Sequence, residues 1–425
     1  MPIFAAGMLL LAGGYFTLRF RAFYLRHPIR TLRAMPLAGG AKEMLLSLGG
    51  TVGVGNISGV AVALLLGGAG AVFWMWVGAF VSMALKYAEI TLGMLSRRKE
   101  GRGYVGGAPY YIKEAIGSLA AVLFTVLLLA DCVMMGGVIQ SSAIAEAAET
   151  AFGVSPTVCG ILVSVLAAAV FFFDVDLFKL SAYVVPTMSV GYVIAALAVI
   201  VCNARGLPQM FAAIFSGAFA PNAAVGGALG FLLSPALRQG IVKGLFSNEA
   251  GCGTAPTAHI ASEETVPARQ GLFGILEVFV DTVLMCSLTA FVILLTLGEE
   301  LSGIGGGGVA ICARAFGALF QNGAPVMLSI FVFLFAFAAI ISFGYYGAQS
   351  LCFFRGGARY RDAFLLLYCL SLLLGAVAAP AAVWAISDAV ICLMLLLNTS
   401  AVLVSRKKIL HAHGEHMLKT KNRLL

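Results

Sequence analysis

The sequence predicts an all-α polytopic membrane protein. Of its 425 residues, 61% are hydrophobic and only 11% are charged, whereas a soluble protein of this length needs far more polar surface. Apolar runs of roughly 20 residues, each long enough to cross a hydrocarbon core of about 30 Å, recur along the whole chain. The alternating pattern of membrane-spanning strands is absent, so helices remain as the way to satisfy the backbone in lipid.

Eleven apolar segments are the candidate transmembrane helices. They cover residues 3–20, 44–66, 70–96, 116–149, 154–173, 181–202, 237–261, 269–297, 324–353, 362–380 and 382–404. The first resembles a secretory signal in length, but its positive residues, beginning with Arg19 and Arg21, follow it instead of preceding it. This order indicates a first span whose N-terminus lies outside.

The basic residues agree with this count, because an odd number of spans puts the two termini on opposite sides. Most of them fall in residues 19–42, 97–113, 355–361 and 406–423, which all lie on one side of the predicted topology. We therefore expect a plasma-membrane protein with a cytoplasmic C-terminus. The net charge of +8 sits at span ends and forms no separate basic domain, which argues against nucleic-acid binding.

Two segments interrupt their spans with glycines and polar side chains. They are residues 48–59 (LGGTVGVGNISG) and 246–256 (FSNEAGCGTAP), and each carries an Asn and two glycines two residues apart. Glycines that let helices pack closely would explain either segment alone. The pair, in corresponding positions of two halves, favours the discontinuous helices that form the binding site of secondary transporters.

The two interruptions also suggest how the chain is organised. We expect a peripheral first span with a basic cytoplasmic segment (1–43), a five-helix repeat (44–202), an external loop (203–236), a second five-helix repeat (237–404) and a basic cytoplasmic tail (405–425). Each repeat would open with a broken span, as an inverted five-plus-five repeat requires.

Several motifs resemble the sodium:alanine (alanine or glycine:cation) symporter family. They are GTVGVGNISGVA, GGAGAVFWMWVGAF, KYAEITL, GLFSNEAGCGTAP and VFVDTVLMC, and the resemblance covers most of the chain. It implies a LeuT-like fold with one extra N-terminal span, and a symporter of small neutral amino acids such as alanine or glycine, coupled to sodium or another cation. The implied partners are a small amino acid and the lipid bilayer, and no cofactor is implied beyond Na+ as the coupling ion.

The two breaks supply the groups that an amino-acid zwitterion needs. Exposed N–H groups suit its carboxylate and freed carbonyls suit its ammonium group. By the resemblance, the amides of Val54 and Gly55 hold the carboxylate, and carbonyls near Phe246 and Ser247 hold the ammonium. Gln140, in the middle of a span, also matches a substrate-binding position of the family, although a buried amide often serves only as a helix-helix contact.

The resemblance implies two sodium sites, of which one has lost ligands. The first would use the Thr51 carbonyl, the Asn56 side chain and Ser247. The second would use carbonyls of Gly49 and Val52 with two hydroxyls from the eighth core span.

The family's two hydroxyl residues are replaced here by Ala338 and Ala339. Hard cations want about six oxygen ligands, so we expect substrate affinity to depend only weakly on sodium.

Other charged residues within the spans have simpler explanations. Lys86 and Glu89 are three residues apart and are expected to pair with each other. Glu277 and Asp281, four residues apart, present two carboxylates on one helix face, for a cation, for a proton or for structural hydrogen bonds. Asp131 receives no role from the sequence.

An enzyme is not expected, and a non-transporting amino-acid sensor is the alternative to a symporter. No HExxH or GxSxG motif occurs, and the tail histidines are expected to be solvated. The nine cysteines are scattered without the spacing of a zinc site or a disulfide framework. The loss of the eighth-span hydroxyls is what favours the sensor.

The predicted side-chain pocket is larger than alanine needs. Phe246, Glu249 and Cys252 would form its wall, and the family usually has Met at the position of Cys252. The smaller residue leaves room, so we expect a neutral amino acid larger than alanine to be taken up faster than alanine. An uptake screen of neutral amino acids in which alanine exceeds every larger one would contradict this.

Overall fold

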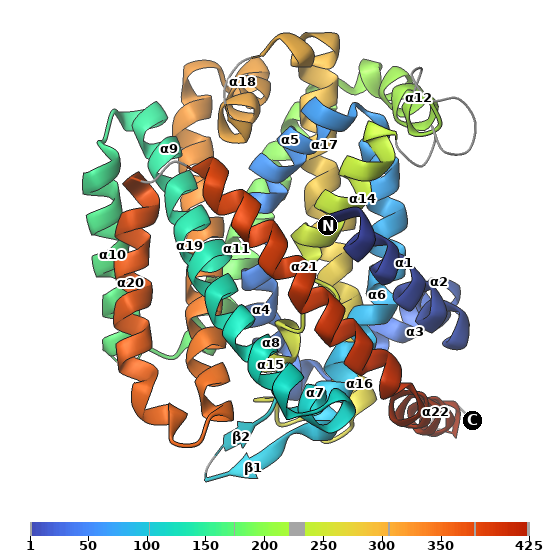
Figure 1. The fold of residues 1–425 in the computed structure, drawn as a ribbon. Coiled ribbons are helices and arrows are strands. Elements are labelled where there is room, and N and C mark those ends of the chain that lie inside the picture. Colours follow the sequence, from blue (N-terminus) through green and yellow to red (C-terminus); the bar gives the residue numbers. More distant parts are fainter. Residues whose placement is uncertain are drawn as a thin grey trace.

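The structure is a computed structural model that describes residues 2–101, 103–173, 175–220, 234–304, 307–377 and 380–422. Within them the chain is almost wholly helical, and most helices run between the two ends of the molecule (Figure 1). A two-stranded antiparallel hairpin, β1 (Arg98–Glu100) and β2 (Gly103–Val105), lies at the lower end in this view, with Arg98 opposite Val105.

The helices follow one another along the described chain. The α-helices are α1 (Pro2–Arg19), α2 (Phe23–Arg26), α3 (Pro28–Arg33), α4 (Leu37–Thr51), α5 (Ser58–Gly67), α6 (Gly70–Ser96), α7 (Ala108–Ile116), α8 (Ser118–Asp131), α9 (Gln140–Phe152), α10 (Pro156–Phe172), α11 (Leu177–Cys202), α12 (Leu207–Ala218), α14 (Pro235–Asn248), α15 (Ala255–His259), α16 (Pro267–Val278), α17 (Ser287–Thr296), α18 (Gly308–Phe320), α19 (Ala324–Ser350), α20 (Arg361–Val377), α21 (Pro380–Val404) and α22 (Arg406–Asn422).

By length and apolar composition alone, seven helical segments of the described chain can cross a membrane. They are Gly70–Ser96, Ser118–Phe152, Leu177–Cys202, Pro267–Thr296, Gly308–Phe353, Gly357–Val377 and Val383–Val404. The pair Gly39–Thr51 and Val54–Gly67, bent by 59° at a short break, makes an eighth if it counts as one span. The protein is therefore a multi-pass membrane protein.

Both predicted interruptions are present. The first separates α4 from α5 and holds a single 3-10 turn, Val54–Asn56. The second separates α14 from α15, and three of its residues have a positive φ: Glu249 (52°), Gly251 (87°) and Gly253 (79°). Glycine adopts this conformation freely, whereas the glutamate is strained there, as residues at binding sites often are.

Two spans contain π-helical segments that the sequence did not predict. Cys132–Ile139 joins α8 to α9, and Phe279–Cys286 joins α16 to α17. A π-helix accommodates an extra residue within a helix and is frequent at functional sites. Both segments lie within spans that reach the two breaks.

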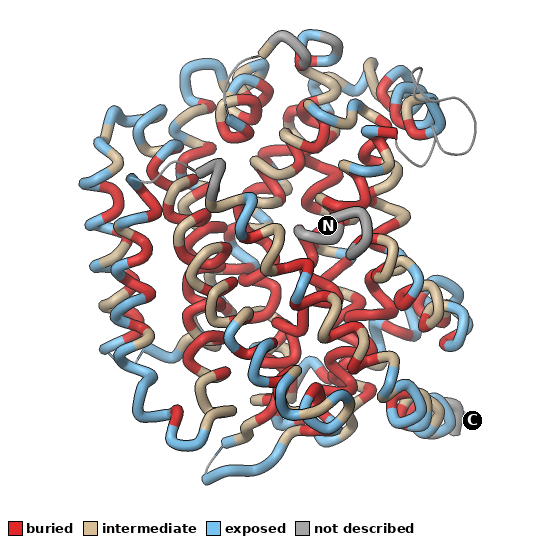
Figure 2. The backbone as a smooth tube through the Cα atoms, viewed as in Figure 1, coloured by how far each residue is buried: buried red, intermediate tan, exposed pale blue. Residues whose placement is uncertain are grey.

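Burial is concentrated around the broken helices, whereas the outer helices expose apolar side chains. Figure 2 shows the buried backbone at the centre and exposed backbone along α10 and α20. The outward-facing residues include Leu162 (63% exposed) and Leu367 (64%), which suit lipid and would be costly in water. In the interior, a Cβ at Gly240 of α14 would overlap the Ala71 carbonyl of α6, so glycine permits this close packing.

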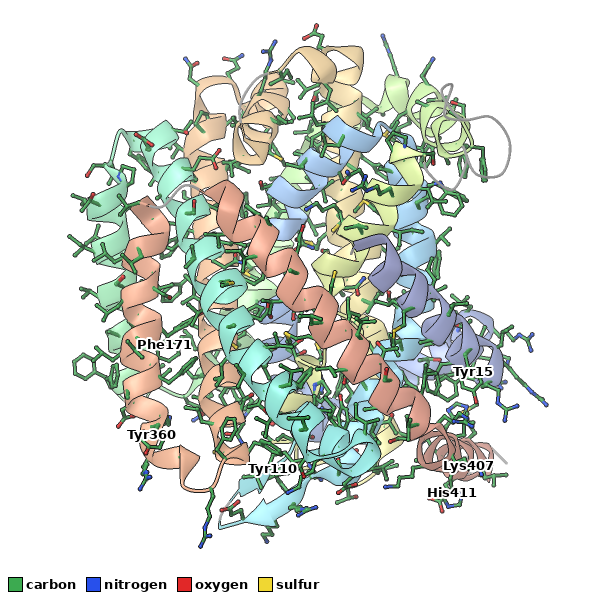
Figure 3. All side chains as sticks on the ribbon, in the orientation of Figure 1. Tyr15, Tyr110, Phe171, Tyr360, Lys407 and His411 are labelled. Carbon is green, nitrogen blue, oxygen red and sulfur yellow. The ribbon has the colours of Figure 1, made fainter. Side chains whose placement is uncertain are left out.

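The tail helix α22 packs against the bundle, contrary to the expectation that its histidines are solvated. The His413 ring lies 4.5 Å from the Phe20 ring and 5.1 Å from the Phe23 ring, between centroids, and its Nδ1 is 2.9 Å from the Tyr87 hydroxyl. Only His411 keeps the predicted exposure, on the outer side of α22 with Lys407 (Figure 3). Burial lowers the pKa of His413 from 6.5 to about 4.

Acidification should weaken the docking of α22. Because the docked pKa of His413 lies below 6.5, the neutral ring is favoured in the docked state; docking is strongest above pH 6.5 and weakens as the pH falls toward 4. The protection factors of the α22 amides, which correct the exchange rate for the intrinsic rate at each pH, should therefore be lower at about pH 5 than at about pH 7.5. His413→Phe should reduce this dependence, with the remainder coming from His416, whose pKa burial also lowers, and His411→Phe should keep it. Equal protection factors at both pH values in the wild type would contradict the assignment.

Candidate functional site

The two breaks meet at one carboxylate, that of Asp281 in the π-helical segment of the α16–α17 span. Asn56 from the first break donates through Nδ2 to Asp281 Oδ1 at 2.7 Å, and Ser247, beside the second break, donates to Asp281 Oδ2 at 2.8 Å. Thr282 also donates to Oδ2 at 2.8 Å. All four residues are buried. The Asp281 carboxylate thus brings together two predicted cation-site residues, Asn56 and Ser247.

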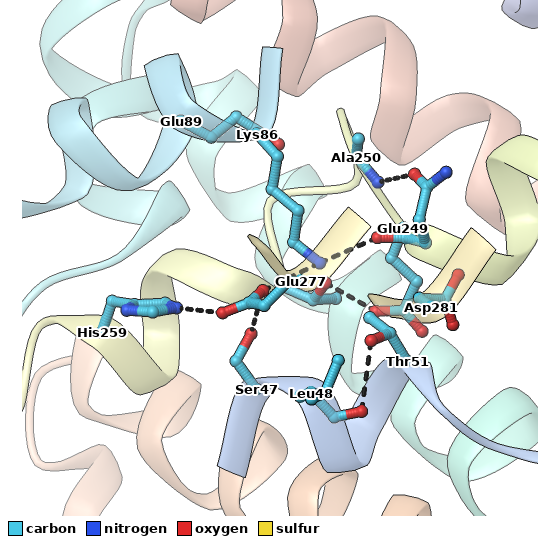
Figure 4. Close-up of polar contacts among 12 residues, drawn as sticks. Ser47, Leu48, Thr51, Lys86, Glu89, Glu249, Ala250, His259, Glu277 and Asp281 are labelled. Atoms are coloured by element: carbon cyan, nitrogen blue, oxygen red, sulfur yellow. Dashed lines mark hydrogen bonds and ion pairs between the residues drawn. The ribbon is translucent and has the colours of Figure 1, made fainter. Parts of the chain in front are cut away.

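Asn56 also organises the first break. Its Oδ1 accepts a hydrogen bond from the Gly53 N–H at 3.1 Å, which satisfies a donor freed by the unwinding. Its own carbonyl accepts from Thr289 Oγ1 at 2.8 Å, and that hydroxyl is 2.6 Å from the hydroxyl of Tyr192. Thr51, by contrast, donates its hydroxyl to the Leu48 carbonyl within α4 (Figure 4).

The predicted carboxylate cradle lies beside open space. The Val54 N–H donates to Gln140 Oε1 at 3.3 Å, so Gln140 of α9 reaches the first break as expected of a residue facing it. The Gln140 amide nitrogen donates to the Met135 carbonyl at 3.2 Å, which fixes the side chain. Apart from Gly55 itself, its chain neighbours and the adjoining helix backbone, no atom of the described residues lies within 4 Å of where a Cβ at Gly55 would be. The Val54 N–H is thus already engaged, and the room lies beside Gly55.

The predicted pocket wall is only partly described. The Glu249 carboxylate accepts a hydrogen bond from Thr254 Oγ1 at 2.7 Å across the second break, and Cys252 is 3% exposed. Phe246 lies in α14, but its side chain is outside the part of the chain that the structure describes. These residues belong to one break, and no hydrogen bond joins their side chains to Gln140 among the described contacts.

The region predicted for a second cation faces methyl groups. Gly49 and Val52 lie at the C-terminal end of α4 and beside it. A Cβ at Gly49 would be 3.6 Å from the Ala338 Cβ and 3.2 Å from Ser342 Oγ of α19. That hydroxyl donates to the Leu46 carbonyl at 2.7 Å, so it serves the packing of α19 on α4.

Lys86 does not pair with Glu89, contrary to the sequence-based expectation. Its Nζ lies 3.0 Å from Glu277 Oε2 and donates to the Asn248 carbonyl, at the end of α14, at 2.8 Å (Figure 4). Spacing along one helix favours local pairing, but this long side chain reaches a helix C-terminus, where the macrodipole attracts a cation.

Glu277 is fully engaged in structural bonds. Besides Lys86, its carboxylate accepts from Ser47 of α4 at 2.9 Å, and the His259 Nε2 of α15 lies 2.6 Å away. The Gln270 amide nitrogen in turn lies 2.7 Å from His259 Nδ1. Of the alternatives that the sequence left open for Glu277, the structure therefore shows structural hydrogen bonding. The Glu277 carboxylate ties the first broken helix, through Ser47, to the second, through His259.

Glu89 takes a role that the sequence did not predict. Its Oε2 accepts from the Gly251 N–H at 2.8 Å and its Oε1 accepts from the Gly253 N–H at 3.0 Å. Asn398 of α21 donates to the same carboxylate and to the Gly251 carbonyl. The unwound second break is thus satisfied from two neighbouring spans. Only the three-dimensional packing reveals this, because Glu89 and the break are far apart in sequence.

Metal chemistry beyond a hard cation has no support in the described residues, where no group of three or more His, Cys, Asp or Glu side chains is placed to hold a metal ion.

Removing Lys86 should destabilise the fold strongly. Lys86→Met leaves the buried Glu277 charge without its ion partner, which costs about 3–5 kcal/mol. The double variant Lys86→Met, Glu277→Gln removes both charges and should recover much of this loss. Thermal unfolding of the purified variants in detergent measures the effect, and a double variant no more stable than Lys86→Met would show that the ion pair is not the cause.

The chain is similar to proteins named as amino-acid symporters and carriers. The chain is 34% identical to the sodium/alanine symporter AgcS of Methanococcus maripaludis over 86% of this chain and 83% of that one. It is 34% identical to the putative sodium/proton-dependent alanine carrier YrbD of Bacillus subtilis (87% and 79% covered), and 32% identical to the probable sodium/glutamine symporter GlnT of the same organism (95% and 86%).

Solved structures show the fold of membrane transporters. A Na+-coupled sialic acid symporter in a substrate-bound outward-open state matches with a TM-score of 0.62 at 12% identity, covering 95% of this chain and 86% of that one. A mutant manganese transporter of Eremococcus coleocola matches with a TM-score of 0.56 at 11% identity, covering 85% and 76%. These proteins are transporters and not enzymes. The sodium:alanine symporter family profile matches residues 2–424, and the chain belongs to this family.

Proposed function

We propose that the protein is a secondary active symporter of small neutral amino acids such as alanine or glycine, coupled to sodium or another cation. Its family already makes it an amino-acid transporter. The observation that carries the finer proposal is the carboxylate of Asp281, which joins Asn56 and Ser247 from opposite breaks at 2.7 and 2.8 Å, beside the open backbone at Gly55.

The architecture that we propose is a LeuT-like five-plus-five inverted repeat with one extra N-terminal span, about eleven transmembrane helices in all. The repeats would be residues 44–202 and 237–404, with 1–43, 203–236 and 405–425 outside them. The broken spans α4–α5 and α14–α15 open the two halves in corresponding positions, which supports this division. The distribution of basic residues supports an external N-terminus and a cytoplasmic C-terminus.

The substrate would lie between the breaks. Its carboxylate would bind the amides of Val54 and Gly55, and Gln140 Oε1, which accepts the Val54 N–H in the present structure, would have to move aside. Its ammonium group would bind the carbonyls near Phe246 and Ser247. Fixed backbone dipoles suit this task in a dry site, because an unmatched charge there is costly.

The coupling cation would bind next to the substrate. The Asp281 carboxylate, the Ser247 hydroxyl, the Thr51 carbonyl and the Asn56 amide oxygen are the hard oxygen ligands that a sodium ion prefers. In the present structure Asn56 turns its nitrogen toward Asp281, so a cation would require its amide to rotate. A carboxylate supplies the charge that the neutral ligands lack.

A second cation at Gly49 and Val52 has weaker support. The face of α19 that lies against them presents Ala338 and the engaged hydroxyl of Ser342. We therefore propose one cation site, at Asp281. A non-transporting sensor, which the missing hydroxyls allowed, gains no support from relatives named as symporters and carriers.

Transport in proteoliposomes tests this function. Uptake of labelled alanine should accumulate above equilibrium when an inward sodium or proton gradient is imposed, and should only equilibrate without one. Asp281→Asn should lower the gradient-driven accumulation by about tenfold or more, because the cation loses its only charged ligand. Asp362→Asn, an exposed carboxylate at the start of α20, is the matched control and should transport normally.

Two results would contradict the proposal. Failure of the wild type to accumulate any neutral amino acid under any gradient would rule out a symporter. Full gradient-driven accumulation by Asp281→Asn would place the cation elsewhere.

A further inference from the structure

Asp131 is a buried acid that the proposed substrate and cation sites do not use. It lies at the end of α8, where the π-helical segment Cys132–Ile139 begins, inside the membrane span Ser118–Phe152. It is 3% exposed, and its Oδ1 has no hydrogen-bond partner among the described residues.

The other four buried acids of the broken-helix region all have donors. Glu89 accepts from two backbone N–H groups, Glu277 from Lys86 and Ser47, Asp281 from three side chains and Glu249 from a threonine. Asp131 differs from them in having an oxygen that is both inaccessible and unpaired. An unsatisfied polar group in a native interior calls for an explanation.

Among the described residues, no cation compensates the charge of Asp131. The charged group that interacts with it is another acid, Glu249 of the second break, and the thiols of Cys132 and Cys252 lie within reach of both carboxylates. Lys86, the buried cation of this region, is bound to Glu277 and to the end of α14.

The described residues of the helices packed against α8 bring no cation to Asp131 either. On α7, Tyr111 binds Asn398 and Lys113 is exposed. On α19, Tyr346 interacts with Glu249 and Cys132. On α21, the titratable groups Asp388 and Cys392 interact with each other, and Asp388 also interacts with Lys243. Their charges therefore do not neutralise Asp131.

An ionised carboxylate in this position would be costly, since an isolated charge in a low-dielectric interior loses many kcal/mol of solvation. The carboxylic acid form avoids this cost. Its Oδ1 is inaccessible, and a proton needs no cavity. Ionisable residues retained inside membrane spans are typically parts of ion or proton pathways.

We propose that Asp131 is the proton-carrying residue of this symporter, which takes up a proton on one side of the membrane and releases it on the other. The proposal rests on the proposed transport function. When the segment is open to one aqueous side, the carboxylate takes a proton from a hydronium ion, whose O–H bond breaks as the O–H bond of the carboxylic acid forms. The neutral acid permits closure, and its O–H bond breaks when the other side opens and the proton passes to water there. The proton would take the place of the second cation, whose site faces Ala338.

The test separates coupling from exchange. The purified full-length protein is reconstituted in proteoliposomes. In the first assay, uptake of labelled alanine is driven by an imposed pH gradient in sodium-free buffer. In the second assay, external labelled alanine exchanges for internal unlabelled alanine without a gradient. Asp131→Asn should reduce gradient-driven accumulation by about tenfold or more and leave exchange within about twofold of the wild type. Asp131→Glu should restore accumulation, and Asp388→Asn, the control from another span, should keep both activities.

Each remaining outcome counts against the proposal. The proton-carrying role is overturned if Asp131→Asn accumulates alanine as well as the wild type, or if only sodium gradients drive the wild type. Either result leaves the proposed symporter function standing. Loss of alanine exchange together with loss of pH-driven uptake in Asp131→Asn would make Asp131 a substrate-binding residue instead. A wild type that exchanges no amino acid removes the proposed function itself, and this inference with it.

Discussion

The backbone that is freed at the two breaks has no water to bind in lipid, so the site depends on buried side chains that take the place of water. Glu89 accepts the N–H groups of Gly251 and Gly253, and Asn56 accepts that of Gly53. These bonds hold both breaks open without exposing unsatisfied groups. A polar binding site can therefore exist in the middle of an otherwise apolar bundle.

Two other carboxylates connect the two broken helices. Glu277 binds Ser47 of α4 on one side and, through Lys86, the end of α14 on the other. Asp281 makes a second connection between the breaks, from the same span. The broken helices and the α16–α17 span are thus held as one unit, which is what movement of a rigid bundle around a binding site requires.

The sequence predicted the breaks because glycine and asparagine leave a local signature, and it predicted that Asn56 and Ser247 belong to one site because of the family motifs. It did not predict the partner of Lys86. Spacing along a helix identifies only neighbours on the same helix, whereas this long side chain reaches Glu277 on another helix. The capping role of Glu89 was hidden for the same reason. Asp131 gave no signal, because an unpaired oxygen is visible only once its neighbours are placed.

The π-helical segment Cys132–Ile139 has a consequence for mapping this span. An α-helix repeats every 3.6 residues, but a π-helical segment takes more residues for each turn, so the faces before and after it are out of phase. A single helical wheel drawn from Ser118 to Phe152 would assign the wrong side to one of its halves. Accessibility scans by cysteine labelling should be read with two registers, one for α8 and one for α9, and only then do Asp131 and Gln140 take their proper places on the helix surface.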